Sequence, residues 1–222
     1  MCGRFTQRKT EQQLVTRFDV TNLLFETSLR YNIAPMQFIA AIIQSNVRQL
    51  VGFKWGLIPA WAKDVKIANN LINARAETLE EKPSFRTPFQ KRRCLIPADG
   101  WYEWKKEGAG KQPYFFHRRD DELFAFAGLW EEWKSPEGER IQTCTIITTE
   151  ANELAADFHH RMPVILRPQD ESLWLDPAAP MADLFDLLIP YPDDDLEIYP
   201  VSRAVNSPAN DIEEMVFKLE VS

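Results

Sequence analysis

Several features are scarce in this chain, and each scarcity excludes a class of protein. The 222 residues include three cysteines, at Cys2, Cys94 and Cys144, without CxxC spacing, so we expect neither a disulfide framework nor a zinc site. No stretch approaches the roughly 20 apolar residues of a membrane span, and the amino-terminal segment has no signal-peptide core. The sequence therefore predicts a cytoplasmic protein that contacts no membrane and holds no metal or other cofactor.

Positive charge is also in short supply. Lysine and arginine total 26 against 33 acidic residues, which gives a net charge of -7. This balance argues against indiscriminate nucleic-acid binding, so any DNA contact must use a local basic patch. The acidic triplet at 193–195 is expected to be a solvated turn. An apolar content of 45% suffices for one core, and we expect a single domain over residues 1–222 and a monomer.

The pattern of apolar residues predicts a β-rich chain. Runs at 38–43 and 47–55 with a Ser-Asn turn between them indicate a hairpin, and further strand-like runs lie at 93–96, 101–104, 113–117, 123–130, 143–148, 163–166 and 196–201. Helical periodicity is confined to 10–18, 76–81, 150–157, 168–175 and 181–188. We therefore predict an α+β fold: one twisted, barrel-like mixed sheet with short peripheral helices.

Cysteine at position 2 suggests chemistry, because removal of Met1 would leave an amine and a thiol two carbons apart. An α-amine has a pKa of about 7.7 to 8.0, so part of it is neutral near pH 7. The two groups can attack one aldehyde in succession, giving first an imine and then a thiazolidine ring. Gly3 allows close approach, and Arg4 places a cation near the thiol, which would favour thiolate. A second-position cysteine without a role is the alternative, whereas Cys94 and Cys144 are expected in the core.

Two further clusters carry titratable groups. Period-2 alternation in 98–104 puts Glu103 on the face of Trp101, where partial desolvation would raise the pKa of the carboxyl and suit it to proton transfer. His159 and His160 precede Arg161 at a helix-to-strand junction, a place suited to acid-base work. The simpler alternative for Glu103 is a surface residue on an edge strand. For the histidines, it is a capping or core role.

The segment 71–78 contains Asn73 and Arg75, which share one face if the chain is extended there. Asn73 could orient the amine of Cys2, and Arg75 could bind a phosphate. The alternative is a structural pair ahead of a helix.

Taken together, these segments resemble the SOS-response-associated peptidase (SRAP) family of abasic-site-processing proteins. The motifs run in order over nearly the whole chain: MCGRF at 1–5, RYNIAP at 30–35, WGLIP at 55–59 with Trp61, INARAE at 72–77, CLIPADGWYEW at 94–104, HHRMP at 159–163 and VSRAVN at 201–206. The ordered set is far more specific than any one motif.

The resemblance implies a role for each matching residue. Cys2 is then the covalent residue, Asn73 orients it, Glu103 transfers protons and His159 assists sugar opening and imine chemistry. His159 is preferred to His160 because the pattern reads His-any-Arg-Met-Pro. The residues expected at the DNA are Arg4, Asn32, Pro35, Trp61, Arg75, Arg161 and, more weakly, Thr148.

The implied activity is covalent capture of abasic sites in single-stranded DNA through a thiazolidine on Cys2. An abasic-site lyase side activity and autocatalytic removal of Met1 would accompany it. Two other functions fit parts of the sequence. Cys2 could attack an amide as an N-terminal nucleophile, although no oxyanion hole is evident. Aromatics and arginines could also serve a binder of single strands without any chemistry.

Overall fold

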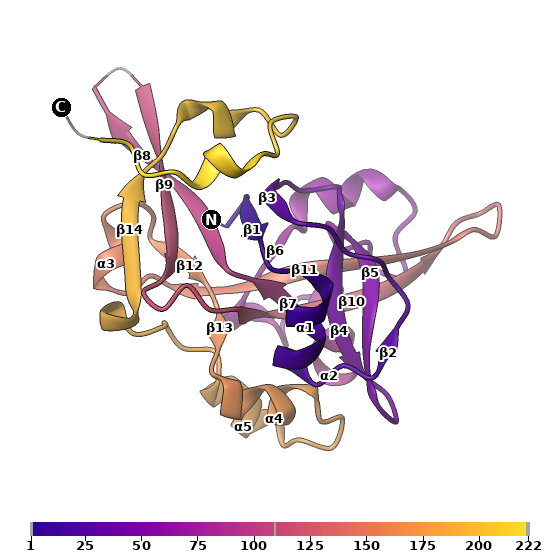
Figure 1. Cartoon of the computed structure of the whole chain (residues 1–222). Coiled ribbons are helices and arrows are strands. Elements are labelled where there is room, and N and C mark those ends of the chain that lie inside the picture. The colour runs from indigo at the N-terminus through magenta and orange to yellow at the C-terminus, as the bar shows by residue number, and fades with distance from the viewer. Residues whose placement is uncertain (1, 109, 221–222) are drawn as a thin grey trace.

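Five strands close into a barrel at the centre of the molecule. In the computed structural model, which describes residues 2–108 and 110–220, the antiparallel order is β11 (Arg140–Glu150), β10 (Phe124–Lys134), β7 (Arg93–Ala98), β4 (Phe38–Gln44) and β5 (Arg48–Trp55) (Figure 1). A parallel pairing of β5 with β11 closes the ring. The predicted barrel-like mixed sheet is therefore confirmed, as is the hairpin of β4 and β5.

Short strands extend the barrel along β11 and its neighbours. β6 (Asn73–Arg75) runs parallel to β11, and β12 (Arg161–Pro163) runs antiparallel to it. β13 (Ile165–Leu166) pairs with β10, and β2 (Asn22–Leu23) with β5. The strands that carry Asn73 and Arg161 thus both pair with β11.

A second sheet of five strands holds the amino-terminal segment. Its order is β14 (Leu196–Pro200), β9 (Gly110–Arg118), β8 (Gly100–Glu107), β1 (Phe5–Gln7) and β3 (Arg30–Ile33). β1 lies between β8 and β3, so the chain enters the fold in the interior of a sheet (Figure 1). The residues just before β1 are therefore placed beside β8.

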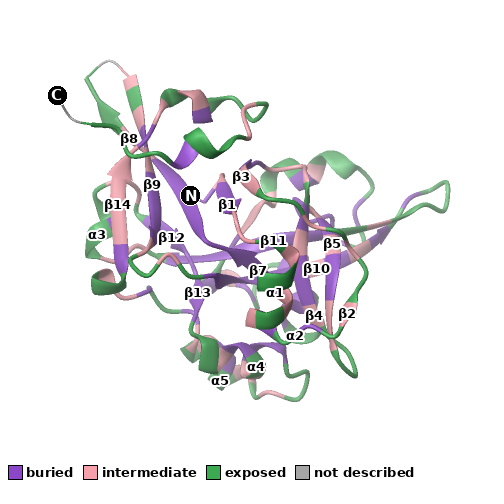
Figure 2. Ribbon diagram, viewed as in Figure 1, coloured by how far each residue is buried: buried purple, intermediate pink, exposed green. Residues whose placement is uncertain are grey.

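Alternating residues of the barrel strands supply two apolar cores. Leu50 and Leu95 pack with residues of the helices, including Phe18 and Trp174. Their sequence neighbours Val51, Cys94 and Ile96 instead pack with residues of the second sheet: Phe5, Trp101, Phe116 and Leu196. Cys94 and Cys144 are fully buried in this second core, as predicted. Figure 2 shows the buried strands at the centre and the exposed helix faces around them.

The helices are short and peripheral, as expected. They are α1 (Glu11–Phe18), α2 (Pro83–Lys91), α3 (Glu153–Ala156), α4 (Glu171–Leu175) and α5 (Met181–Asp186). Single 3-10 turns cover Val65–Asn70, Ala76–Thr78, Pro168–Asp170, Asp193–Asp195, Arg203–Asn206 and Glu213–Val216. Thr10 and Gln13 form a capping box that fixes the start of α1. None of the described helices has the length and apolarity to cross a bilayer.

Two helix predictions need correction, and one helix was missed. The segment 76–81 forms only a 3-10 turn at Ala76–Thr78. The predicted helix at 150–157 begins too early, because Glu150 still belongs to β11 and the side chain of Asn152 caps α3. α2 was not predicted because Pro83 and Pro88 read as turn residues, yet Pro83 stands in its first turn, where proline fits.

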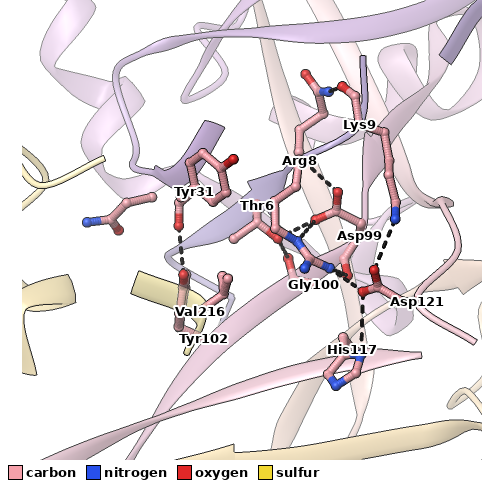
Figure 3. A network of polar contacts seen from close by, with 12 residues as sticks. Thr6, Arg8, Lys9, Tyr31, Asp99, Gly100, Tyr102, His117, Asp121 and Val216 are labelled. Carbon is pink, nitrogen blue, oxygen red and sulfur yellow. Dashed lines mark hydrogen bonds and ion pairs between the residues drawn. The ribbon is translucent and has the colours of Figure 1, made fainter. Parts of the chain in front are cut away.

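A buried polar network anchors β1 (Figure 3). The carboxylate of Asp99, which is fully buried, accepts hydrogen bonds from Thr6 Oγ1 at 2.5 Å and from the backbone N–H of Arg8 at 2.5 Å. The Arg8 guanidinium also bonds to Asp99 at 2.9 Å and reaches Asp121 at 2.5 Å. One carboxylate thereby fixes the strand that follows Cys2.

Candidate functional site

Cys2 lies three residues ahead of Phe5, the first residue of β1, and its side chain is fully buried. Asn73 Nδ2, at the start of β6, donates a hydrogen bond of 2.8 Å to the carbonyl oxygen of Cys2. Asn73 therefore contacts the backbone of Cys2 through the carbonyl group, and its expected role in orienting the Cys2 amine stays a prediction. Met1 lies outside the described residues.

Glu103 faces Cys2 from β8. Trp101 packs in the same core as Cys2, whereas Tyr102 packs in a separate cluster with Val205, so the predicted alternation is confirmed. Burial raises the pKa of Glu103. The pKa of the Cys2 thiol is also raised, first by burial and then by the negative charge of Glu103. The site therefore holds sulfur as a neutral thiol next to a carboxyl group of increased basicity.

Arg4 favours thiolate only through its backbone N–H, whose hydrogen bond lowers the pKa of Cys2, and not through its cation as expected. The Arg4 guanidinium donates to Asn32 Oδ1 at 2.8 Å and to the carbonyl of Val205 at 2.7 Å, and lies 5.8 Å from the centre of the Trp104 ring. It is directed to the far face of β8, where Trp104 lies. Burial and the charge of Glu103 raise the pKa of the thiol, and the backbone hydrogen bond from Arg4 lowers it by less.

His159 lies between α3 and β12, at the predicted junction. Its Nδ1 accepts a hydrogen bond of 3.0 Å from the backbone N–H of Arg161, so in the neutral ring the proton is on Nε2. Burial lowers the pKa of His159 to about 4, and the charge of Arg161 acts in the same direction. The ring is neutral near pH 7 and offers an N–H donor. His160 stacks on it at 4.3 Å and is more exposed.

Arg161 and Thr148 are placed inside the protein. The Arg161 guanidinium binds both oxygens of Glu77, at 2.5 and 2.9 Å, and donates to the Thr148 carbonyl at 2.5 Å. Both Arg161 and Thr148 are buried. A phosphate could reach this guanidinium only in exchange for Glu77.

Asn32 is also fully buried. Its Nδ2 donates to the carbonyls of Ser207 at 3.0 Å and Asn210 at 2.6 Å, and its Oδ1 accepts from Arg4. In this arrangement Asn32 supports the carboxy-terminal segment and the Arg4 side chain.

Three of the predicted DNA contacts are accessible. The Trp61 side chain is 58% exposed, Arg75 is exposed at the end of β6, and Pro35 is half-buried, as is Arg4, whose guanidinium is already engaged by Asn32 and Val205. Arg75 and Asn73 alternate with the buried Ala74, which confirms the shared face.

The structure thus brings Cys2, Asn73 and Glu103 together and adds two residues that sequence reasoning did not single out. Glu77 lies within the INARAE motif, but only tertiary structure reveals it as the partner of Arg161. Lys105 shares the face of Glu103, and period-2 alternation extended by two residues would have found it. Within residues 2–108 and 110–220, no group of three or more His, Cys, Asp or Glu side chains has the arrangement to hold a metal ion.

Comparison with known proteins assigns this arrangement to a family. Residues 1–208 match the family model described as SOS response associated peptidase (SRAP). The chain is 49% identical to the abasic site processing protein YoqW of Bacillus subtilis, covering 97% of this chain and 99% of YoqW. It is 36% identical to chicken abasic site processing protein HMCES, covering 80% of this chain and 60% of that protein. A crystal structure of a protein from Bacteroides thetaiotaomicron matches 99% of this chain with a TM-score of 0.89 at 29% identity.

Proposed function

The chain belongs to the SOS response associated peptidase (SRAP) family, and from that premise we propose that it captures abasic sites in single-stranded DNA as a covalent thiazolidine on Cys2. The names of its relatives YoqW and HMCES support abasic-site processing. The geometry of the site supports the more specific proposal of a thiazolidine linkage to Cys2.

The observation that carries the proposal is the pairing of Cys2 with Glu103. A buried thiol of raised pKa is a poor first nucleophile, since the thiolate is the reactive form. It is a suitable second nucleophile if a base lies beside it. Removal of Met1 would supply the first nucleophile, the α-amine of Cys2, while Asn73 holds the adjoining carbonyl group.

The proposed reaction has two bond-forming stages. The neutral amine attacks the aldehyde carbon C1′, and the carbinolamine loses water to give an imine. The Cys2 sulfur then bonds to C1′, the C=N bond becomes single, and the thiol proton passes to the ring nitrogen. No oxidant or cofactor is needed, and the product keeps the DNA strand intact.

Glu103 and His159 would share the proton transfers. An abasic sugar is mostly a closed hemiacetal, so a proton must leave the C1 hydroxyl and another must reach the ring oxygen. A carboxylate of raised basicity suits the first step, and the Nε2–H of neutral His159 suits the second. Without sulfur, the imine acidifies the neighbouring sugar carbon and permits β-elimination, which accounts for a lyase side activity.

Contact with the strand would begin at the exposed residues. Trp61 offers a ring for base stacking, Pro35 an apolar surface and Arg75 a charge for phosphate, a combination that binds single strands with little sequence preference. Arg4, Arg161 and Thr148 would contact DNA only after rearrangement of their internal bonds. The lesion itself is recognised by its aldehyde.

Cleavage of the Met1–Cys2 bond is the peptidase activity that the family description suggests for this chain. Cys2 would have to act on its own preceding peptide bond, and general hydrolysis of other peptides is the competing function. Incubation of the mature protein with a panel of peptides separates self-processing from general hydrolysis. If the activity is limited to self-processing, none of the peptides should be cleaved.

Intact mass spectrometry tests the proposal directly. After incubation with a single-stranded oligonucleotide holding one abasic site, the mature protein should gain the mass of the oligonucleotide less one water. Protein alkylated at Cys2 should gain none. Glu103→Gln should form the same adduct about 10- to 1,000-fold more slowly, the usual scale of acid-base contributions. Stable adduct on chains that retain Met1 would refute the mechanism.

A further inference from the structure

Lys105 lies on β8 two residues beyond Glu103. Resting on the function proposed above, we infer that Lys105 binds a backbone phosphate of the DNA strand beside the lesion. Successive residues of a strand point to opposite faces, so Lys105 leaves the sheet on the side of Glu103 and Trp101. Its Cα lies about 6.8 Å further along β8 than that of Glu103.

The contacts of Lys105 place its ammonium group against Phe158, the residue before His159 in the chain. Its Nζ lies 4.9 Å from the centre of the Phe158 ring, and Phe158 directly precedes His159. Phe158 in turn meets the ring of Tyr114 edge to face at 4.8 Å, and Tyr114 stands opposite Glu103 in the β8–β9 pair. Lys105 therefore lies against Phe158, on the face of β8 from which Glu103 projects.

The charge of Lys105 is available to a ligand. Its Nζ lies 3.7 Å from Asp157 Oδ2, and the Asp157 side chain is 77% exposed, so solvent weakens the attraction between the two charges. Arg4 and Arg161 are more constrained, because the Arg4 guanidinium donates to Asn32 and Val205 and the buried Arg161 guanidinium binds both carboxylate oxygens of Glu77. A phosphate can reach Lys105 without breaking any buried hydrogen bond.

Arg75 supplies a second cation, from the barrel side of the site. It is exposed at the end of β6, two residues beyond Asn73, which bonds to Cys2. Lys105 comes from the five-stranded sheet and Arg75 from the barrel. A DNA strand that places its lesion at Cys2 would then have one accessible cation on the five-stranded sheet and one on the barrel.

Equilibrium binding to an oligonucleotide containing tetrahydrofuran, an abasic analogue without an aldehyde, tests the inference apart from the covalent chemistry. Lys105→Gln should weaken binding about fivefold at low salt and reduce the slope of log affinity against log salt by about 0.7, the value of one single-strand phosphate contact. Lys106→Gln is the matched control. It removes the same charge from the neighbouring exposed residue on the opposite face of β8, and should change affinity less than about twofold.

Neutral methylphosphonates, introduced one at a time beside the lesion, identify the phosphate. A methylphosphonate at one position should lower the affinity of the wild-type protein but leave the affinity of Lys105→Gln unchanged. Lys105→Arg should respond to that substitution as the wild-type protein does. Equal affinities and salt slopes for Lys105→Gln and Lys106→Gln would overturn the inference. A second result would also overturn the inference: Lys105→Met binds DNA with normal affinity but forms adduct slowly at saturating DNA. Lys105 would then act by positioning Phe158 and His159, and not by binding a phosphate. Absence of adduct from wild-type protein would refute the proposed function separately.

Discussion

Burial controls protonation around Cys2. It raises the pKa of the thiol and of the Glu103 carboxyl, and it lowers that of His159. All three shifts favour the uncharged forms. A site designed around a standing thiolate would show the reverse shift at sulfur. The residues therefore suit a reaction that the amine starts and the thiol completes.

Replacement of Cys2 by alanine separates the two nucleophiles. In Cys2→Ala the α-amine survives, so an imine can form, but no sulfur is available to close the ring. We expect the heat-stable adduct to disappear and strand cleavage at the lesion to increase. Borohydride should trap the imine as a permanent crosslink, which denaturing gel electrophoresis detects. Formation of the wild-type adduct by Cys2→Ala without reductant would show that sulfur is not the closing nucleophile.

The pKa of His159 gives a pH prediction with a definite sign. Its value is about 4 in the folded protein and 6.5 ordinarily, so between these values the unfolded chain binds more protons than the folded one. The stability contributed by the neutral ring is complete above pH 6.5 and is lost progressively as the pH falls towards 4. Nitrogen NMR should show neutral His159 protonated at Nε2 down to about pH 5. A midpoint near 6.5 would contradict this.

Individual residues differed in how far the sequence could specify them. The face of Glu103 follows from alternation alone, and the burial of Cys94 and Cys144 follows from their apolar neighbours. The pairing of Arg161 with Glu77 spans 84 positions, so no local pattern encodes it. The same holds for Arg4, whose partner Val205 is 201 positions away.

Strand β1 is short, and the Asp99 network compensates for that. Three residues cannot hold the chain against fraying by strand pairing alone, and register shifts within β1 where it pairs with β3. Thr6 and Arg8 supply the missing attachment through one buried carboxylate. Because Cys2 precedes this strand directly, the network also limits where Cys2 can lie.

Asp99→Asn tests this anchoring role. The amide keeps the shape but leaves Arg8 without its buried counter-charge, so the free energy of unfolding should fall by about 3 kcal/mol. Adduct formation at saturating DNA should also slow, because Cys2 loses its fixed position. Asp121→Asn is the control: Asp121 binds the same Arg8 but its side chain is 48% exposed, and the loss should be about 1 kcal/mol or less. Urea denaturation and single-turnover rates measure both effects; identical behaviour of the two variants would exclude an anchoring role for Asp99.

The sequence predicted the elements in which apolar residues recur with a regular period, but not the elements that tertiary contacts stabilise. The runs in β4, β5, β7, β10 and β11 alternate or are uniformly apolar, and each prediction falls within or beside the observed strand. The strands β1, β3 and β6 are three or four residues long, which is too short for a period to show. α2 escaped detection because its two prolines outweighed the apolar spacing of Phe85 and Phe89, which pack in the helix-facing core.

At the scale of the whole molecule, the proposed binding of DNA would have to coexist with a net charge of -7. The acidic balance would repel DNA from most of the surface, so the proposed association would depend on a few local cations such as Arg75 and Lys105. Two to three phosphate contacts on a single strand predict a salt slope of about -1.4 to -2.1. The proposed covalent capture would remove this salt dependence once the thiazolidine ring has closed.

The form of the DNA and the salt dependence together give the last prediction. The longest described α-helices have eight and nine residues, and the exposed Trp61 ring can stack only on a base that is free of its duplex neighbours. An abasic site in a single strand should therefore crosslink faster than the same site in a matched duplex. Raising the salt to about 1 M should suppress new adduct, because phosphate contacts are screened, yet leave preformed adduct intact. Equal rates on the two substrates would argue against a single-strand site, and release of preformed adduct by salt would argue against a covalent bond.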